Sequence, residues 1–193
     1  MRRHYETDLP SSYEEVYTVD AKDRKTVIAM NLAALLPLAA AVLIGWLLIR
    51  PEHFFANYSH IRNLVFLVSM VAYIVLHELV HGAAYKVLTG QKLSFGFTGA
   101  AAFCGVPDIY VYRTASLIAV LAPFCVFTIV FLAFALLAAD SWDRYYAVLL
   151  LGLHIGGCSG DLFNAGLYLF RFRDPGTLTR DTGPKQSFYQ PRI

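Results

Sequence analysis

Long apolar segments alternate with short polar ones along most of this chain. Four segments are almost wholly apolar, and each exceeds the roughly 20 residues that a helix needs to cross the hydrocarbon core of a bilayer. Four soluble core helices of this length, each nearly all apolar, would be unusual. The pattern therefore predicts four transmembrane helices, at Val27–Ile49, Asn63–Leu88, Thr114–Ala139 and Tyr145–Phe170.

The segment Gln91–Tyr112, between the second and third apolar segments, has a different pattern. Leu93, Phe95 and Phe97 alternate with smaller or polar residues, which is the period of a β-strand, and several glycines interrupt the rest of the segment. We expect a short strand or hairpin that dips into the cytoplasmic face, with a plain loop as the alternative. The fold class is then an all-α membrane protein with this one β element between its second and third helices.

Charged residues make up only 16% of the chain, and their placement sets the expected orientation. Five Lys or Arg precede the first apolar segment, five follow the fourth, and three occupy the first and third connections. Three more, Lys86, Lys92 and Arg113, lie between the last turn of the second segment and the start of the third. Cytoplasmic segments carry the excess of basic residues. We therefore expect both termini in the cytoplasm, with a polar arm at 1–26, a membrane domain at 27–170 and an irregular tail at 171–193.

The first apolar segment begins too far along the chain for the core of a secretory signal and is long enough to span a bilayer. We interpret it as an uncleaved anchor. The net charge of +2 is small and gives no indication of a nucleic-acid partner.

The second apolar segment contains the sequence His77-Glu78-Leu79-Val80-His81, an HExxH motif. Two histidines four residues apart project from nearly the same face of a helix, so one zinc ion can bridge them. Glu78, beside the first histidine, can touch a water on the metal without ligating the metal itself. The motif predicts a zinc site on the second helix, with Glu78 as the general base.

A third ligand is predicted on the fourth helix. Only two carboxylates lie deep in an apolar segment, Glu78 and Asp161, and charged groups placed there are rarely idle. His77 lies nine residues before Lys86, and Asp161 lies ten residues before Arg171. Both are then roughly 14 Å from the cytoplasmic surface, at 1.5 Å per residue. The equal depth predicts that Asp161 meets the histidines. A buried hydrogen-bonded network without a metal is the alternative.

Other residues are candidates for supporting roles. Asn164 follows Asp161 by one turn and could orient its carboxylate, hold substrate backbone or be structural. His154 precedes Asp161 by two turns and could support or replace a ligand, stabilise an oxyanion, or be a satisfied core histidine. Phe95 and Phe97 belong to an edge that could capture an unwound substrate by adding a strand.

The remaining patterns concern helix packing and cysteines. Gly152, Gly156 and Gly160 recur every four residues, a spacing that lets membrane helices approach closely, and Gly156, Gly157 and Gly160 could let the helix loosen. The three cysteines are odd in number and lack paired spacing, so we expect free buried thiols, with a place near the metal as an alternative for Cys158. They are Cys104, Cys125 and Cys158.

The sequences HELVHG and SGDLFN resemble those of the "putative zincin peptidase" family of small bacterial four-span membrane proteins. That family in turn is distantly similar to the site-2 proteases, which cleave substrates within membranes. The resemblance implies that His77, His81 and Asp161 ligate zinc and that Glu78 is the catalytic acid and base. One feature departs from the site-2 pattern, because Gly160 precedes the aspartate and no proline is adjacent to it.

These observations favour an integral zinc metallopeptidase of the bacterial cytoplasmic membrane. It would hydrolyse membrane-embedded or membrane-proximal peptide bonds by a zinc-activated water. The expected partners are a membrane-protein or peptide substrate and the lipid bilayer, without nucleic acid; the sequence gives no oligomeric state. Two alternatives remain open: a membrane protein that binds metal or haem without proteolysis, and a catalytically inactive regulator that keeps the zincin fold.

Overall fold

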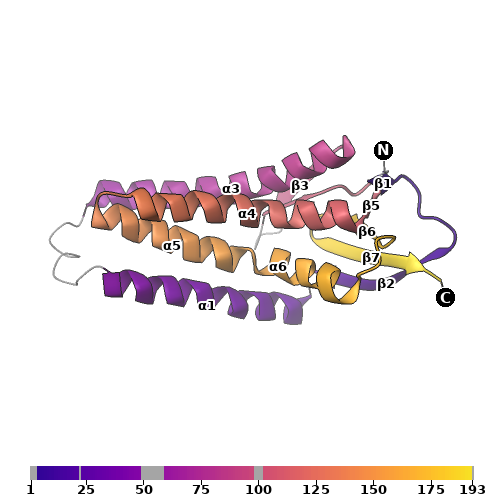
Figure 1. The fold of residues 1–193 in the computed structure, drawn as a ribbon, viewed down its shortest axis with the longest axis horizontal. Helices are drawn as coiled ribbons and strands as arrows, with labels where there is room; N and C mark the ends of the chain where they lie inside the picture. The colour runs from indigo at the N-terminus through magenta and orange to yellow at the C-terminus, as the bar shows by residue number, and fades with distance from the viewer. Residues whose placement is uncertain (1–3, 22, 49–58, 98–101, 193) are drawn as a thin grey trace. The chain divides into compact units, whose positions relative to one another are not determined.

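The structure is a computed structural model that describes residues 4–21, 23–48, 59–97 and 102–192 (Figure 1). Its contacts divide the chain into two compact units. The sheet unit consists of Met1–Ile28, Leu76–Pro123 and Asp161–Ile193, and the helix unit consists of Ala29–Val75 and Phe124–Gly160. Each unit is therefore built from segments that are far apart in the sequence.

Three of the predicted spans coincide with single helices. They are α1 (Arg24–Leu48), α3 (His60–Thr89) and α4 (Arg113–Leu137), and all are long and apolar enough to cross a membrane. Many of their large apolar side chains are exposed, with Leu36 at 74% and Leu137 at 82%. Such surfaces are unfavourable in water and favourable in lipid.

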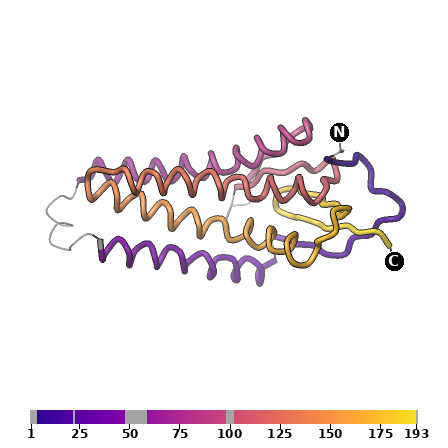
Figure 2. The backbone as a smooth tube through the Cα atoms, viewed as in Figure 1, coloured from indigo at the N-terminus to yellow at the C-terminus, as the bar shows by residue number. Residues whose placement is uncertain are grey.

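The predicted fourth span is not one continuous helix. It consists of α5 (Ser141–Gly157), α6 (Ser159–Gly166) and the π-helical turn η1 (Leu167–Arg171), with the interruption at Cys158. Asp140 begins α5 as its N-cap, because its carboxylate accepts the backbone N–H of Trp142 at 2.7 Å. The backbone trace in Figure 2 follows the interrupted helix, and its parts together are long and apolar enough for one span.

Two glycines of α5 allow α1 to pack closely against it within the helix unit. A Cβ atom on Gly152 would clash with the Cβ of Ala41, and one on Gly156 would lie 2.5 Å from the carbonyl oxygen of Ala34. The close-packing interpretation of this glycine spacing is therefore confirmed for these two positions.

A five-stranded antiparallel sheet contradicts the all-α expectation, and the tail is not irregular. Its strands run in the order β1-β5-β6-β7-β2, so the N-terminal arm pairs directly with the tail. Three of these strands, β1, β5 and β6, have only two to four residues, and most of the pairings join segments that are distant in sequence, so local periodicity gives little sign of the sheet. They are β1 (Tyr5–Glu6), β2 (Tyr13–Asp20), β5 (Tyr110–Tyr112), β6 (Leu178–Asp181) and β7 (Lys185–Pro191).

The predicted hairpin between the second and third spans is confirmed. It consists of β3 (Ser94–Phe97) and β4 (Ala102–Gly105), which pair antiparallel in a separate two-stranded sheet. Phe95 and Phe97 project from β3 and are 49% and 70% exposed. The hairpin thus presents aromatic side chains outward from a strand that follows the HExxH helix directly.

The core of the sheet unit lies between α3, α4 and the segment that leads into β5. Tyr85 is its largest member, and its apolar neighbours are Val106, Ile109, Val111, Ala115 and Ala119. This cluster fixes the second half of α3, which carries the HExxH motif, against the first half of α4.

The cysteines are free thiols, as expected. Cys104 and Cys158 are buried, but Cys125 is exposed on α4, so the expectation that it is buried was wrong. Burial raises the pKa of the Cys104 thiol to about 12. That group is therefore neutral at physiological pH and a poor nucleophile or metal ligand.

Candidate metal centre

The two histidines of the HExxH motif face the same region of the sheet unit. His77 and His81 project from one face of α3, and both are only 8% exposed. Their ring centroids are 4.9 Å apart with the rings nearly perpendicular. This arrangement follows from their four-residue spacing, which is close to one helical turn.

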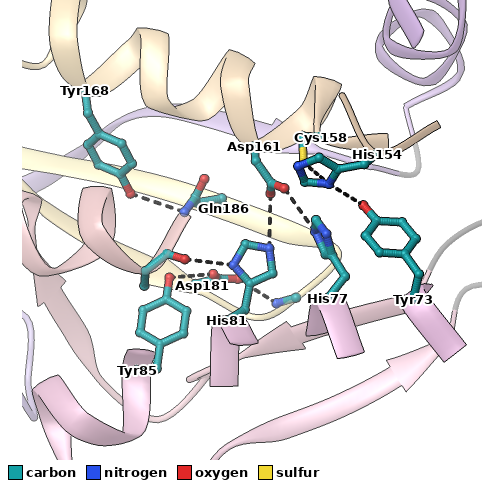
Figure 3. A network of polar contacts seen from close by, with 12 residues as sticks. Tyr73, His77, His81, Tyr85, His154, Cys158, Asp161, Tyr168, Asp181 and Gln186 are labelled. Carbon is teal, nitrogen blue, oxygen red and sulfur yellow. Dashed lines mark hydrogen bonds and ion pairs between the residues drawn. The ribbon is translucent and has the colours of Figure 1, made fainter. Parts of the chain in front are cut away.

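Asp161 of α6 completes a cluster of three possible ligands. Its Oδ2 lies 3.2 Å from Nε2 of His77, and its Oδ1 lies 3.4 Å from Nε2 of His81 (Figure 3). One ligand atom from each residue lies within 4.8 Å of the others. The expectation that this aspartate and the two histidines share a level is therefore met.

The donor set fits zinc. Zinc takes imidazole and carboxylate ligands at about 2.0–2.2 Å, so two donors around a tetrahedral ion lie about 3.3 Å apart. The separation of 3.2 Å between Nε2 of His77 and Oδ2 of Asp161 is of this size, and one donor atom from each of the three residues lies within 4.8 Å of the others. Three protein ligands leave one tetrahedral position open, which distinguishes catalytic zinc sites from closed structural ones.

A backbone carbonyl of α4 sets the tautomer of His81. Nδ1 of His81 lies 2.8 Å from the carbonyl oxygen of Ala119 and donates its proton to it. The Nε2 lone pair of a neutral ring then faces Asp161. An N–H bond of this kind orients a metal-binding histidine and raises its basicity.

Glu78 is half-buried beside the first histidine, and its carboxylate lies near the backbone of Cys104 in β4. It is not a member of the three-residue ligand cluster. The glutamate thus lies between the hairpin and the three possible ligands without belonging to the ligand cluster. Such a carboxylate can exchange a proton with a water bound among the three ligands.

A comparison with protein families matches residues 70–175 to the family described as "putative zincin peptidase". The chain belongs to this family. The matched region contains the HExxH motif and Asp161 and ends before β6. No curated protein and no solved structure matches the chain. Membership in the zincin peptidase family supports zinc-dependent metallopeptidase chemistry at this site.

Asn164 of α6 lies one turn beyond Asp161. Its Oδ1 is buried and accepts no hydrogen bond from the residues that the structure describes. A buried carbonyl oxygen without a donor is unfavourable, and a donor from substrate or water would relieve the cost.

His154 lies in the helix unit, where both of its ring nitrogens have partners. Nδ1 lies 2.8 Å from the hydroxyl of Tyr73, and Nε2 lies 3.1 Å from the hydroxyl of Thr128 and 3.3 Å from the carbonyl oxygen of Phe124. These contacts account for a buried histidine as part of the core. A role for His154 in supporting the metal stays a prediction.

Sequence reasoning missed two residues next to the motif. Tyr85, one turn after His81, donates its hydroxyl to Oδ2 of Asp181 in β6 at 2.8 Å. Burial raises the pKa of Asp181 to about 6, although the hydrogen bonds from Gly183 and Tyr85 oppose the shift. The carboxylate is therefore mostly ionised at neutral pH, and the hydrogen bonds from Gly183 and Tyr85 stabilise its buried charge. The four-residue spacing could have indicated Tyr85, but nothing in the sequence pattern indicates its partner.

Proposed function

We propose that this zincin peptidase is an integral membrane metallopeptidase that hydrolyses membrane-embedded or membrane-proximal peptide bonds. The observation that carries the proposal is the approach of the two carboxylate oxygens of Asp161 to His77 and His81, at 3.2 and 3.4 Å. The HExxH glutamate stands beside this cluster, outside the ligand set. Three ligands and one adjacent base are the parts that a hydrolytic zinc site needs.

The roles follow from chemistry and position. His77, His81 and Asp161 hold the zinc ion, which when bound supplies a Lewis acid for activating water and polarising the scissile carbonyl. Glu78 accepts a proton from the attacking water and passes it to the leaving amine nitrogen. Asn164 offers its buried Oδ1 to a backbone N–H of the substrate.

We place this activity in the bacterial cytoplasmic membrane, with four spans and both termini in the cytoplasm. Pairing of β2 with β7 supports the placement of both termini on one side of the membrane, because a bilayer cannot lie between two hydrogen-bonded strands. The excess of basic residues in the arm, the second connection and the tail supports the cytoplasmic assignment.

Substrate would bind along β3. In the described part of the chain this strand pairs only with β4, so its other edge offers backbone groups to an extended peptide. A peptide bond within a helix is shielded, and a locally unwound segment added to this edge would be held by main-chain hydrogen bonds. Phe95 and Phe97 are exposed and would contact substrate side chains.

Proline at position 97 is expected to impair cleavage without loss of zinc. Phe97→Pro removes a side chain and a backbone N–H, whereas Phe97→Ala removes the side chain alone. If the strand edge binds substrate, the proline variant should be the slower of the two by about tenfold, which corresponds to one hydrogen bond of roughly 1.4 kcal/mol. Cleavage and bound zinc should be measured on the same preparations. Equal rates for the two variants would remove the strand-addition hypothesis.

Removal of the metal should stop the reaction reversibly. We expect membranes that contain the wild-type protein to generate new peptide N-termini, which can be identified by sequencing terminal peptides. Treatment with 1,10-phenanthroline should abolish their formation, and added zinc should restore it, because zinc binding to three ligands is reversible. A calcium chelator is the control. Termini that still form in phenanthroline would contradict a zinc peptidase.

A further inference from the structure

The turn between β6 and β7 has a fixed geometry built around a buried carboxylate. Thr182 donates its backbone N–H to the carbonyl oxygen of Lys185 at 3.0 Å, and Gly183 donates its N–H to Oδ1 of Asp181 at 2.8 Å. Gly183 has φ of +91°, a conformation that favours glycine. The turn therefore holds the Asp181 side chain in one orientation.

The backbone of this turn lies directly against the end of β4. Val106 donates its N–H to the carbonyl oxygen of Asp181 at 2.8 Å. A Cβ atom on Gly105 would lie 2.5 Å from the nitrogen of Gly183 and 2.8 Å from the same carbonyl oxygen, so no side chain fits there. Because the contact is backbone on backbone, β4 cannot shift without moving the turn.

The side chain of Asp181 meets the HExxH helix at the same time. Its Oδ2 accepts the hydroxyl of Tyr85 at 2.8 Å, and Tyr85 is 1% exposed (Figure 3). Tyr85 follows Glu78 by seven residues, two helical turns, so both lie on the same face of α3. One residue of β6 thus joins the catalytic helix to the end of β4.

The hairpin is also pressed onto α3 close to the glutamate. A Cβ atom on Gly82 would lie 2.8 Å from Cζ of Phe95 and 3.3 Å from Sγ of Cys104. Gly82 follows Glu78 by one helical turn, so these contacts lie on the same face of α3 as the glutamate. The hairpin is therefore fixed to α3 directly near Glu78 and through β6 near Tyr85.

We propose that Asp181 is a positioning residue of the peptidase: by joining Tyr85 of α3 to Val106 of the β4 end, it holds the β3–β4 hairpin in place beside Glu78. The inference rests on the proposed function for the role it gives to Glu78 and to the substrate edge. Asp181 lies beyond the region matched by the family, so this support comes from the tail.

The test removes the hydroxyl that Asp181 accepts. Tyr85→Phe is compared with Tyr168→Phe, which also deletes a buried hydroxyl, one that contacts Thr179 of β6 and Gln186 of β7. Hydrogen–deuterium exchange of the full chain in detergent should become about tenfold faster for the amides of 102–106 in Tyr85→Phe, the size expected for one lost buried hydrogen bond. In Tyr168→Phe these amides should exchange as in the wild type.

Variants of Asp181 test whether the two residues act as one unit. Asp181→Ala should speed exchange at 102–106 at least as much as Tyr85→Phe, because it removes the acceptor of Gly183 as well as that of Tyr85. The double variant should be no worse than Asp181→Ala alone, because the bond lost in Tyr85→Phe is already lost there. Asp181→Asn retains an acceptor for the hydroxyl and should recover part of the protection. Zinc content should stay unchanged in all of them. Cleavage should fall about 10- to 100-fold in Tyr85→Phe, as expected for a small misplacement of reacting groups.

Exchange at 102–106 that is unchanged in Tyr85→Phe, or raised equally in Tyr168→Phe, would overturn the proposal. The proposal would also be overturned if Tyr85→Phe exchanged faster at 102–106 but cleaved at the wild-type rate, because the hairpin would then be loosened without any effect on catalysis. Failure of the peptidase proposal would look different, since the wild type itself would generate no new termini while the contrast in exchange remained.

Discussion

Replacing Glu78 with glutamine is expected to abolish peptide hydrolysis while zinc remains bound. The amide keeps the size of the side chain but cannot accept a proton from water. General acid–base groups contribute about 10²- to 10⁴-fold to rates, so cleavage should fall by that factor or more. The three proposed ligands are untouched, so zinc per chain should equal that of the wild type. Sequencing of terminal peptides from membranes checks the loss of cleavage, and metal analysis of the purified protein checks that zinc is retained.

Glu14→Gln is the matched control for this change. Glu14 is exposed on β2, where it lies 3.9 Å from Arg192, and has no part in the proposed chemistry. It should cleave as the wild type does. If Glu78→Gln formed the same new termini at the same rate, the proposed mechanism would be wrong even if zinc were present.

Loss of the Asp161 carboxylate is expected to empty the metal site. Asp161→Ala leaves two imidazoles as the only protein ligands of the proposed set. Removal of a residue that only hydrogen-bonds to a metal ligand lowers metal affinity about 10- to 100-fold. Loss of a ligand itself should therefore lower zinc affinity at least about 100-fold. Zinc retained after dialysis, measured by mass spectrometry, should drop from about one ion per chain in the wild type to a small fraction.

Asp143→Ala provides the control for this second change. Asp143 lies in the first turn of α5, 3.9 Å from Arg62 in the helix unit, and should leave zinc binding as it is. Full zinc occupancy in Asp161→Ala would show that a different third ligand completes the site. The alternative of a hydrogen-bonded network without metal predicts no zinc in the wild type either.

The parts of the candidate site that depend on helix geometry could be predicted. Spacing alone placed His77 and His81 on one face, and depth in the bilayer matched Asp161 to them. Both arguments use the constant rise and rotation of a helix, which hold regardless of the rest of the fold. Together the spacing and the depth predict that Asp161 meets both histidines, and its carboxylate oxygens lie 3.2 and 3.4 Å from the two rings.

The parts that depend on pairing between distant segments could not be predicted. The carbonyl of Ala119 that orients His81 is a backbone group, which any residue would supply. Asp181 is a polar residue in a polar tail, and only the fold brings it to Tyr85. The strands of the sheet were missed for the same reason, since β2 in the N-terminal arm pairs with β7 at the other end of the chain.

The interruption at Cys158 was only partly foreseeable. The glycines around it allowed two interpretations, close packing and a loosened helix, and both apply. Gly152 and Gly156 pack against α1, whereas the helix ends one residue after Gly156 and begins again just before Asp161. Small residues permit either outcome, and the neighbouring elements decide between them.

The pairing of β2 with β7 also bears on how the protein matures. Thr18 and Ser187 contact each other through their hydroxyls at 2.8 Å although 169 residues separate them. During synthesis the first strand leaves the ribosome early and has no partner until every helix has been made. Because Asp181 is made just before β7, a nascent chain would hold its complete HExxH helix for about half of its synthesis without the support of the tail. The support that Asp181 is proposed to give would therefore form only after the helices have been made.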